Sequence, residues 1–153
     1  MSDYRIIDEP APSGLTKVSV APFWPLLALM FGGAWLAWPW MLINSFAIGS
    51  ATRLRETAIV VGTFVFTIAL SIAVLILLPP DDSKAFEFGV LALQVVKFGC
   101  GYWIFAVQSR SFSLYEYFGG RVSSGLVLIV AGYILRRHVL LAFDSLLWTM
   151  VVA

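Results

Sequence analysis

The chain of 153 residues is 60% hydrophobic and 12% charged, and its formal net charge is +1. Soluble proteins average about 45–50% apolar and about 25% charged residues, so this composition excludes an ordinary soluble domain. The near-neutral charge excludes a broad nucleic-acid-binding surface, and the single cysteine, Cys100, excludes an internal disulfide. We therefore expect an all-α, polytopic integral membrane protein that contacts membrane lipid and binds no nucleic acid.

The chain opens with a polar tail, residues 1–21, in which acidic residues outnumber the early bases. The tail has no basic start followed by a short apolar core and a small-residue cleavage site, so no cleaved signal peptide is expected. Residues 22–153 are expected to form one transmembrane domain. A bilayer core of about 30 Å needs about 20 residues of helix, and the apolar runs predict a bundle of four transmembrane helices, the fourth short.

The first predicted span covers residues 22–43. Pro25 falls in its first turn, where the missing N–H is tolerated, and Pro39 is expected to kink or end the helix near its far end. Small residues on this span allow another helix to approach closely. They are Gly32, Gly33 and Ala37.

The second predicted span covers residues 58–78. Thr63, Thr67 and Ser71 recur every four residues and so lie on one stripe of the helix, where their hydroxyls can bond the backbone or a neighbouring helix. The motif Pro79-Pro80-Asp81-Asp82 then ends the helix. This short turn predicts that the second and third spans are antiparallel neighbours.

The third predicted span, residues 88–107, carries a polar face. Glu87, Gln94, Lys97 and Gln108 lie on one side of the helix at 100° per residue, and Gly101 lies among them as a packing position. A lysine near the bilayer centre costs roughly 2.5–3.5 kcal/mol on insertion scales. This face is therefore expected to point into the bundle.

Two roles are open for Lys97. It can be a structural residue that bonds carbonyls or pairs with an acid, or it can bind an anionic ligand, a lipid headgroup or a carboxylate on a partner helix. We predict that Lys97→Leu preserves the fold, because a buried charge replaced by an apolar residue of similar volume is often neutral. Gln94 and Gln108 are expected to make hydrogen bonds between helices.

A polar and aromatic loop is predicted between the third and fourth spans, with Gly119-Gly120 allowing a sharp return. It is either an interfacial aromatic belt or a surface that docks a partner protein. The candidate docking residues are Arg110, Phe112, Tyr115, Tyr117, Phe118 and Arg121.

The C-terminal part is ambiguous because Arg136, Arg137 and His138 interrupt an apolar sequence. In the favoured interpretation, residues 122–138 form a short fourth span and residues 139–153 form an interfacial helix. In the alternative, the two apolar runs form a re-entrant hairpin.

Basic residues are almost evenly divided between the two sides of a four-span bundle. One side would carry Arg5, Lys17, Lys84, Arg136 and Arg137, and the other would carry Arg53, Arg55, Arg110 and Arg121. The even number of spans and the uncleaved tail favour both termini in the cytoplasm, with the chain integral to a bacterial inner membrane.

No known catalytic motif is present. One histidine and one cysteine far apart in the sequence form no metal site, and the chain has no Gly-rich phosphate loop, nucleophile elbow or H-E-x-x-H motif. We expect a protein that is not an enzyme and uses no metal or cofactor.

Several single residues together resemble a loose group of small four-helix bacterial membrane proteins without assigned function, some of them immunity partners of toxins. The resemblance covers Leu29 to Leu135, and the short fourth span and the apolar C-terminal segment depart from it. The residues that carry it are Gly32-Gly33, Asn44, Arg53, Arg55, Gln108 and Gly119-Gly120. It implies no ligand or catalytic residue.

Two functions are compatible with these observations. The first is a non-enzymatic membrane interaction protein, either a subunit or a toxin-immunity-type partner, that binds another protein or itself through helix faces and the aromatic loop. The second is a small oligomeric transporter or channel component with a polar path at Gln94, Lys97 and Gln108.

Overall fold

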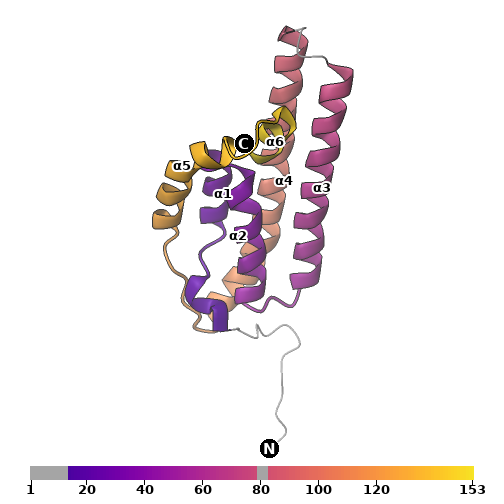
Figure 1. The fold of residues 1–153 in the computed structure, drawn as a ribbon. Coiled ribbons are helices and arrows are strands. Elements are labelled where there is room, and N and C mark those ends of the chain that lie inside the picture. Colours follow the sequence, from indigo (N-terminus) through magenta and orange to yellow (C-terminus); the bar gives the residue numbers. More distant parts are fainter. Residues whose placement is uncertain (1–13, 79–82) are drawn as a thin grey trace, which may run out of the picture.

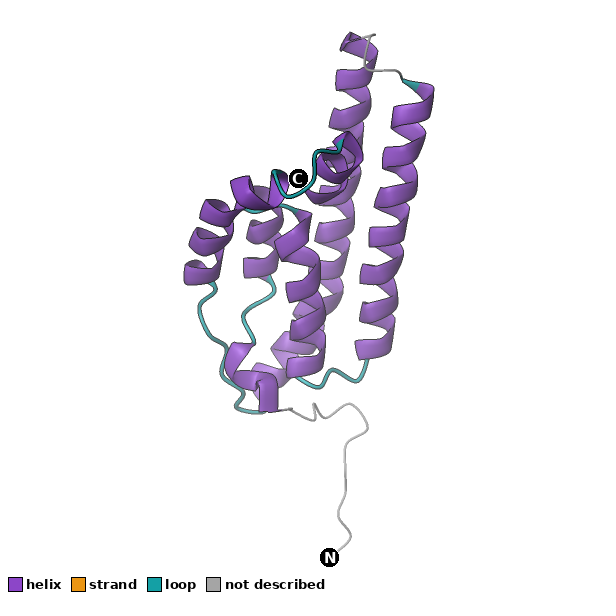
Figure 2. Ribbon diagram, in the orientation of Figure 1, coloured by secondary structure: helices purple, strands orange, loops and turns teal. Residues whose placement is uncertain are grey.

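The computed structural model of the chain describes residues 14–78 and 83–153. The first part of the polar tail and the Pro79–Asp82 turn lie outside the described residues. The described residues form no strand, so the all-α prediction is confirmed for them (Figure 2). Their elements are η1 (Gly14–Val18), α1 (Phe23–Phe31), α2 (Ala34–Ala47), α3 (Arg53–Leu77), α4 (Ser83–Tyr117), α5 (Leu126–Leu140) and α6 (Leu146–Val152).

The predicted single span at residues 22–43 is wrong, because the chain reverses there and forms the antiparallel hairpin α1–α2 (Figure 1). The break occurs at Gly33, whose φ of +101° is a conformation that glycine adopts readily. Pro39 does not end the helix, since α2 continues past it to Ala47.

Asn44 closes the open end of this hairpin. Its side-chain Oδ1 accepts a hydrogen bond from the Val20 backbone N–H at 3.1 Å, and its Nδ2 donates to the Val20 carbonyl at 2.9 Å. Both residues are buried, so water cannot reach the Val20 backbone just before α1, and the Asn44 amide supplies its hydrogen-bond partners instead. The first nine-residue helix is therefore held against the end of the second.

Helices α3 and α4 form the long antiparallel hairpin of the fold and extend well beyond the other helices (Figure 1). The antiparallel arrangement expected for the second and third spans is present. Helix α4 is 35 residues long and continues to Tyr117, past the predicted end at residue 107. Among the described residues, α3 and α4 are the two helices that are long and apolar enough to cross a membrane.

Helix α5 corresponds to the predicted short fourth span, and the C-terminal segment continues as α6. After a turn, α6 folds back over the ends of the shorter helices and packs against α3, with Met150, Val151 and Val152 buried.

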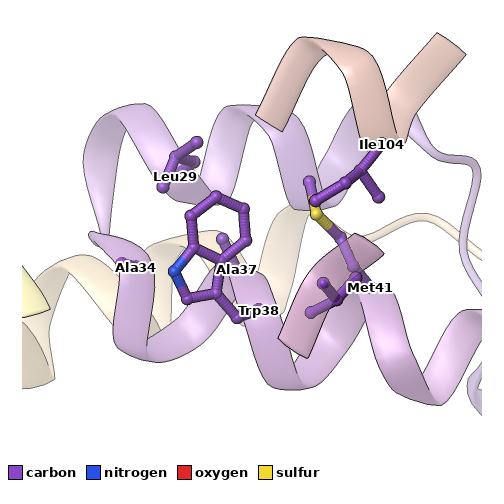
Figure 3. Close-up of a cluster of buried hydrophobic side chains, with 7 residues drawn as sticks. Leu29, Ala34, Ala37, Trp38, Met41 and Ile104 are labelled. Atoms are coloured by element: carbon purple, nitrogen blue, oxygen red, sulfur yellow. The ribbon is translucent and has the colours of Figure 1, made fainter. Parts of the chain in front are cut away.

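The core lies where the α1–α2 hairpin meets α3 and α4. Trp38 and Met41 of α2 pack with Leu29 of α1 and Ile104 of α4 (Figure 3). Ala34 and Ala37 complete the α2 surface of this cluster, and their small side chains allow the helices to approach closely. This packing fixes the end of the bundle at which α2, α3 and α4 bring their polar residues together.

Candidate functional site

The carboxylate of Glu56, in the first turn of α3, is fully buried and surrounded by hydroxyl groups. Its Oε2 accepts a hydrogen bond from Ser45 Oγ at 2.6 Å. Its Oε1 accepts from Ser50 Oγ and Thr52 Oγ1, each at 2.7 Å, and from Ser111 Oγ at 3.1 Å. Charge-assisted bonds of this kind are roughly twice as strong as neutral ones, and they allow a carboxylate to remain inside the protein.

The same cluster connects three helices. Gln108 of α4 donates from Nε2 to Ser45 Oγ of α2 at 2.8 Å and to the Met41 carbonyl at 2.7 Å. The Ser45 hydroxyl in turn donates to Glu56 of α3. A chain of hydrogen bonds thus runs from amide to hydroxyl to carboxylate, which fixes the relative positions of the helices at this end.

The turn between α2 and α3 explains why two hydroxyls reach Glu56. Gly49 has a φ of +63° and reverses the chain directly after α2. Ser50 and Thr52 follow it and lie before the first turn of α3, within reach of a side chain that points back along that helix. The cluster is therefore formed mostly by residues close in sequence, with Ser111 added from α4.

A cavity of about 510 Å³ opens beside this cluster, between the start of α3 and the last third of α4. One part of its wall is polar and is formed by Ser50, Thr52, Arg55, Arg110 and Ser111. The other part is apolar and includes Trp103, Ala106 and Val107. Within the described residues, neither arginine forms an ion pair with the protein.

A second polar feature lies far from this cavity. Lys97 of α4 is fully buried, and its Nζ has no hydrogen-bond partner among the described residues. Another cation, Arg136 of α5, lies close enough to Lys97 for the two charges to repel each other. Arg136 itself donates to the carbonyl of Phe31 at 3.4 Å, near the α1–α2 turn. Two cationic side chains therefore lie close together here, and neither forms an ion pair with an acid among the described residues.

The four residues of the predicted polar face have different surroundings. Lys97 and Gln108 are buried, Gln94 is half-buried and Glu87 is exposed. Gly101 and Ile104 lie between the two buried residues on the same stripe of α4, and both are buried. The interior polar groups are therefore separated by apolar packing and do not form a continuous line.

The predicted packing residues occupy several contacts. An added Cβ at Gly101 would overlap the Leu29 side chain, and one at Gly33 would lie 2.6 Å from the Val152 carbonyl oxygen. The stripe on α3 faces inward, but Thr67 and Ser71 donate to carbonyls of their own helix. The remaining buried members are Gly32, Ala37 and Thr63.

The predicted docking loop is not a loop. Arg110, Phe112, Tyr115 and Tyr117 belong to the last turns of α4, and only Phe118 and Arg121 of the set follow the helix. Phe112 and Tyr115 are buried and pack against Ile48, so they are unavailable to a partner. The polar residues in this segment suggested a loop. In the structure the segment is helical, and Phe112 and Tyr115 on one side of the helix are buried.

Sequence reasoning missed the Glu56 cluster, because Glu56 lies just before the predicted second span at residues 58–78. Its hydroxyl partners are common residue types, and Ser111 is distant in sequence. The usable signal was local: Ser45, Ser50 and Thr52 all precede Glu56 within a short stretch that begins an apolar helix.

A scan against family models and searches of curated proteins and of solved structures found no match to this chain.

Proposed function

We propose that this chain is an integral membrane protein that works by binding a transmembrane helix of another protein. Burial supports the first part. Only 28% of the most apolar stretch of α3 and 22% of that of α4 is buried within the protein, which is unlike the core helices of a soluble domain. Large apolar side chains on their outer faces are exposed, including Val65, Phe66, Ile76, Phe88 and Val95. Lipid would cover them.

The depth of the shorter helices supports the second part. Gly89 packs against Leu78, and Ser111 bonds Glu56. A regular antiparallel register between these contacts puts Lys97 opposite Leu70, about 18 Å along the apolar stretch that begins at Ala58. Helices α1 and α5 end near this level and α2 begins there, while α3 and α4 continue (Figure 1).

The corner between α5 and α6 therefore carries charge about half way through the hydrocarbon. Arg136, Arg137 and His138 lie in the last turns of α5, and Lys97 is buried close to Arg136. Charges at this depth require a partner or water. Asp144 is the acidic residue of the connection between α5 and α6, so the corner has a net positive charge.

The observation that carries the proposal is the unpartnered Lys97 ammonium beside Arg136. Its positive charge favours a partner helix with an acidic residue at mid-depth, seated against the exposed flank of α3–α4 above α6. Lys97 has no exposed surface, so the partner's carboxylate would pair with the arginines and balance Lys97 through space. A toxin of the kind implied by the resemblance, or a larger membrane complex, could supply such a helix.

The transport alternative has less support. Gly101 and Ile104 interrupt the polar face between Lys97 and Gln108, and the amide of Gln108 is engaged by Met41 and Ser45. A path for a solute needs continuous polar lining, and the buried stripe of α4 does not supply one.

Photo-crosslinking in cells tests the proposal. A benzoylphenylalanine in place of Leu141, which is 72% exposed at the charged corner, is expected to capture a membrane protein with an acid inside a transmembrane segment. Arg136→Glu should abolish the product, and changing the partner's acid to arginine should restore it. The matched control replaces Tyr117, 82% exposed at the opposite end of α4, and should give no such product.

Three results would contradict the proposal. Crosslinks only between copies of this chain would show self-association, and crosslinks only to lipid would show that lipid covers the corner. A protein partner whose capture survives Arg136→Glu would bind elsewhere.

A further inference from the structure

The cavity beside the Glu56 cluster has two guanidinium groups and no ligand assigned to it. Arg55 comes from α3 and Arg110 from α4, so the two cations converge from different helices on one space. Neither is used by the protein in an ion pair within the described residues. Both side chains are exposed, and this leaves their donors free for a ligand.

The net charge of this site is positive even with Glu56 nearby. The Glu56 carboxylate is fully buried and accepts bonds from hydroxyl groups, so it presents no surface to the cavity's occupant. Paired guanidinium groups bind phosphate through parallel N–H···O bonds better than they bind a neutral group. The polar wall therefore fits a phosphate-bearing anion.

The apolar residues of the opposite wall favour a phosphate that belongs to a membrane lipid. Trp103, Ala106 and Val107 continue upward from Arg110 along the apolar part of α4, and Trp103 is 55% exposed. This wall lies along the apolar stretch of α4, where acyl chains would lie against the indole ring. The cavity is thus polar at one end and apolar toward the membrane, with a volume of about 510 Å³ in the range of ligand sites.

We infer that this cavity binds the phosphate of an anionic phospholipid headgroup, held by Arg55 and Arg110, with the acyl chains lying along Trp103. Ser50, Thr52 and Ser111 shape the polar wall while the buried Glu56 keeps their hydroxyls oriented. The same chemistry would accept a water-soluble phosphate compound, and the experiment separates these two sources. The site is independent of the partner proposed for the other end of the bundle and shares with it only the membrane insertion.

Native mass spectrometry of the full chain tests the inference. The protein is reconstituted in nanodiscs of phosphatidylcholine and phosphatidylglycerol, released into detergent, and assayed for retained lipid. One phosphatidylglycerol per chain is expected to persist, and Arg55→Gln and Arg110→Gln should each weaken its retention by about tenfold. Arg53→Gln is the matched control, because Arg53 is an exposed arginine at the same end that does not line the cavity.

The thermal midpoint of each variant is measured in parallel. It should be unchanged, since the two exposed arginines form no ion pair with described residues, and a change in retention then reports binding and not misfolding.

Inorganic phosphate, added to protein in pure phosphatidylcholine nanodiscs, identifies the source. If phosphate causes no thermal shift that depends on the arginines, while lipid retention does depend on them, the ligand is a lipid headgroup. A phosphate-induced shift that both Arg55→Gln and Arg110→Gln abolish, without retained phosphatidylglycerol, would overturn the lipid assignment and leave a soluble phosphate ligand. Retention that survives both substitutions, or that falls equally in Arg53→Gln, would overturn the site itself.

Discussion

Lys97 and Gln108 lie on the same buried stripe of α4 but differ in how their polar atoms are satisfied. Gln108 bonds two acceptors on α2, whereas the Lys97 ammonium bonds none among the described residues. A buried donor without a partner is expensive, and more so when it is charged. Gln108 therefore joins two helices, whereas Lys97 is the residue for which we propose a partner outside the chain.

The first prediction concerns Lys97. Lys97→Leu should leave the isolated protein equally stable or stabilise it by about 1–4 kcal/mol, because it removes a desolvated charge while filling the same space. The measurement is the midpoint of thermal unfolding in detergent, followed by tryptophan fluorescence. Leu93→Ala is the control on the same buried stripe and should destabilise by about 2–5 kcal/mol. A marked loss of stability in Lys97→Leu would mean that the ammonium has a partner within the chain.

At the scale of elements, the α1–α2 turn decides the architecture. Gly33 has a positive φ, and the position of its missing side chain is occupied by the carbonyl oxygen of Val152. No other residue type satisfies both conditions without strain, since a Cβ would meet main-chain atoms that cannot rotate away.

The second prediction follows from this turn. Gly33→Ala should lower the stability by about 2 kcal/mol or more, through the strained φ and the clash with α6. Gly99→Ala is a matched control with the opposite sign. Gly99 is helical, an added Cβ there meets nothing within 4 Å, and alanine should stabilise α4 by about 0.5–1 kcal/mol. Thermal unfolding of both variants distinguishes the cases, and a neutral Gly33→Ala would show that the turn can relax.

The long helices and α5 could be predicted from sequence, whereas the α1–α2 hairpin could not. Sustained apolar runs identified α3 and most of α4, because length and composition are local properties. The run from residue 22 to residue 43 is also strongly apolar, yet the chain reverses at Gly33, where the end of α6 packs against the turn. Glycine had been assigned to helix packing there, and only the tertiary contact distinguishes a packing glycine from a turn.

The candidate sites show the same limit. The inward position of Lys97 followed from the periodicity of α4, whereas the cavity between Arg55 and Arg110 depends on the register of two helices. Sequence placed these two arginines on one side of the membrane but gave no reason for them to meet.

At the scale of the whole molecule, the reversal of α1–α2 changes the distribution of charge. Four predicted spans gave a near tie, but most of the basic residues in the described part of the chain belong to the end where α3 begins and α4 ends. They are Lys17, Arg53, Arg55, Arg110 and Arg121, and Lys84 lies at the far end of the α3–α4 hairpin. Basic residues concentrate on the cytoplasmic side, so this end is proposed to face the cytoplasm.

The third prediction tests that orientation with a membrane-impermeant maleimide. In a Cys100→Ala background, Lys84→Cys should label in intact cells, whereas Arg121→Cys should label only after the membrane is opened. Val65→Cys, on the exposed apolar face of α3, should label in neither case, because a thiol in hydrocarbon forms little thiolate. The opposite pattern for Lys84 and Arg121 would reverse the orientation, and rapid labelling of Val65→Cys would argue against lipid around α3.

The contact between α6 and Gly33 has a consequence for how the protein is made. Helix α6 is synthesised after every other described element, yet it packs against the turn of the first hairpin. The α1–α2 hairpin therefore emerges and meets the membrane long before the residues that hold its turn exist. Until α6 is synthesised, the turn of this hairpin lacks its packing partner. Assembly of the bundle is therefore complete only when the last helix packs against the turn between the first two.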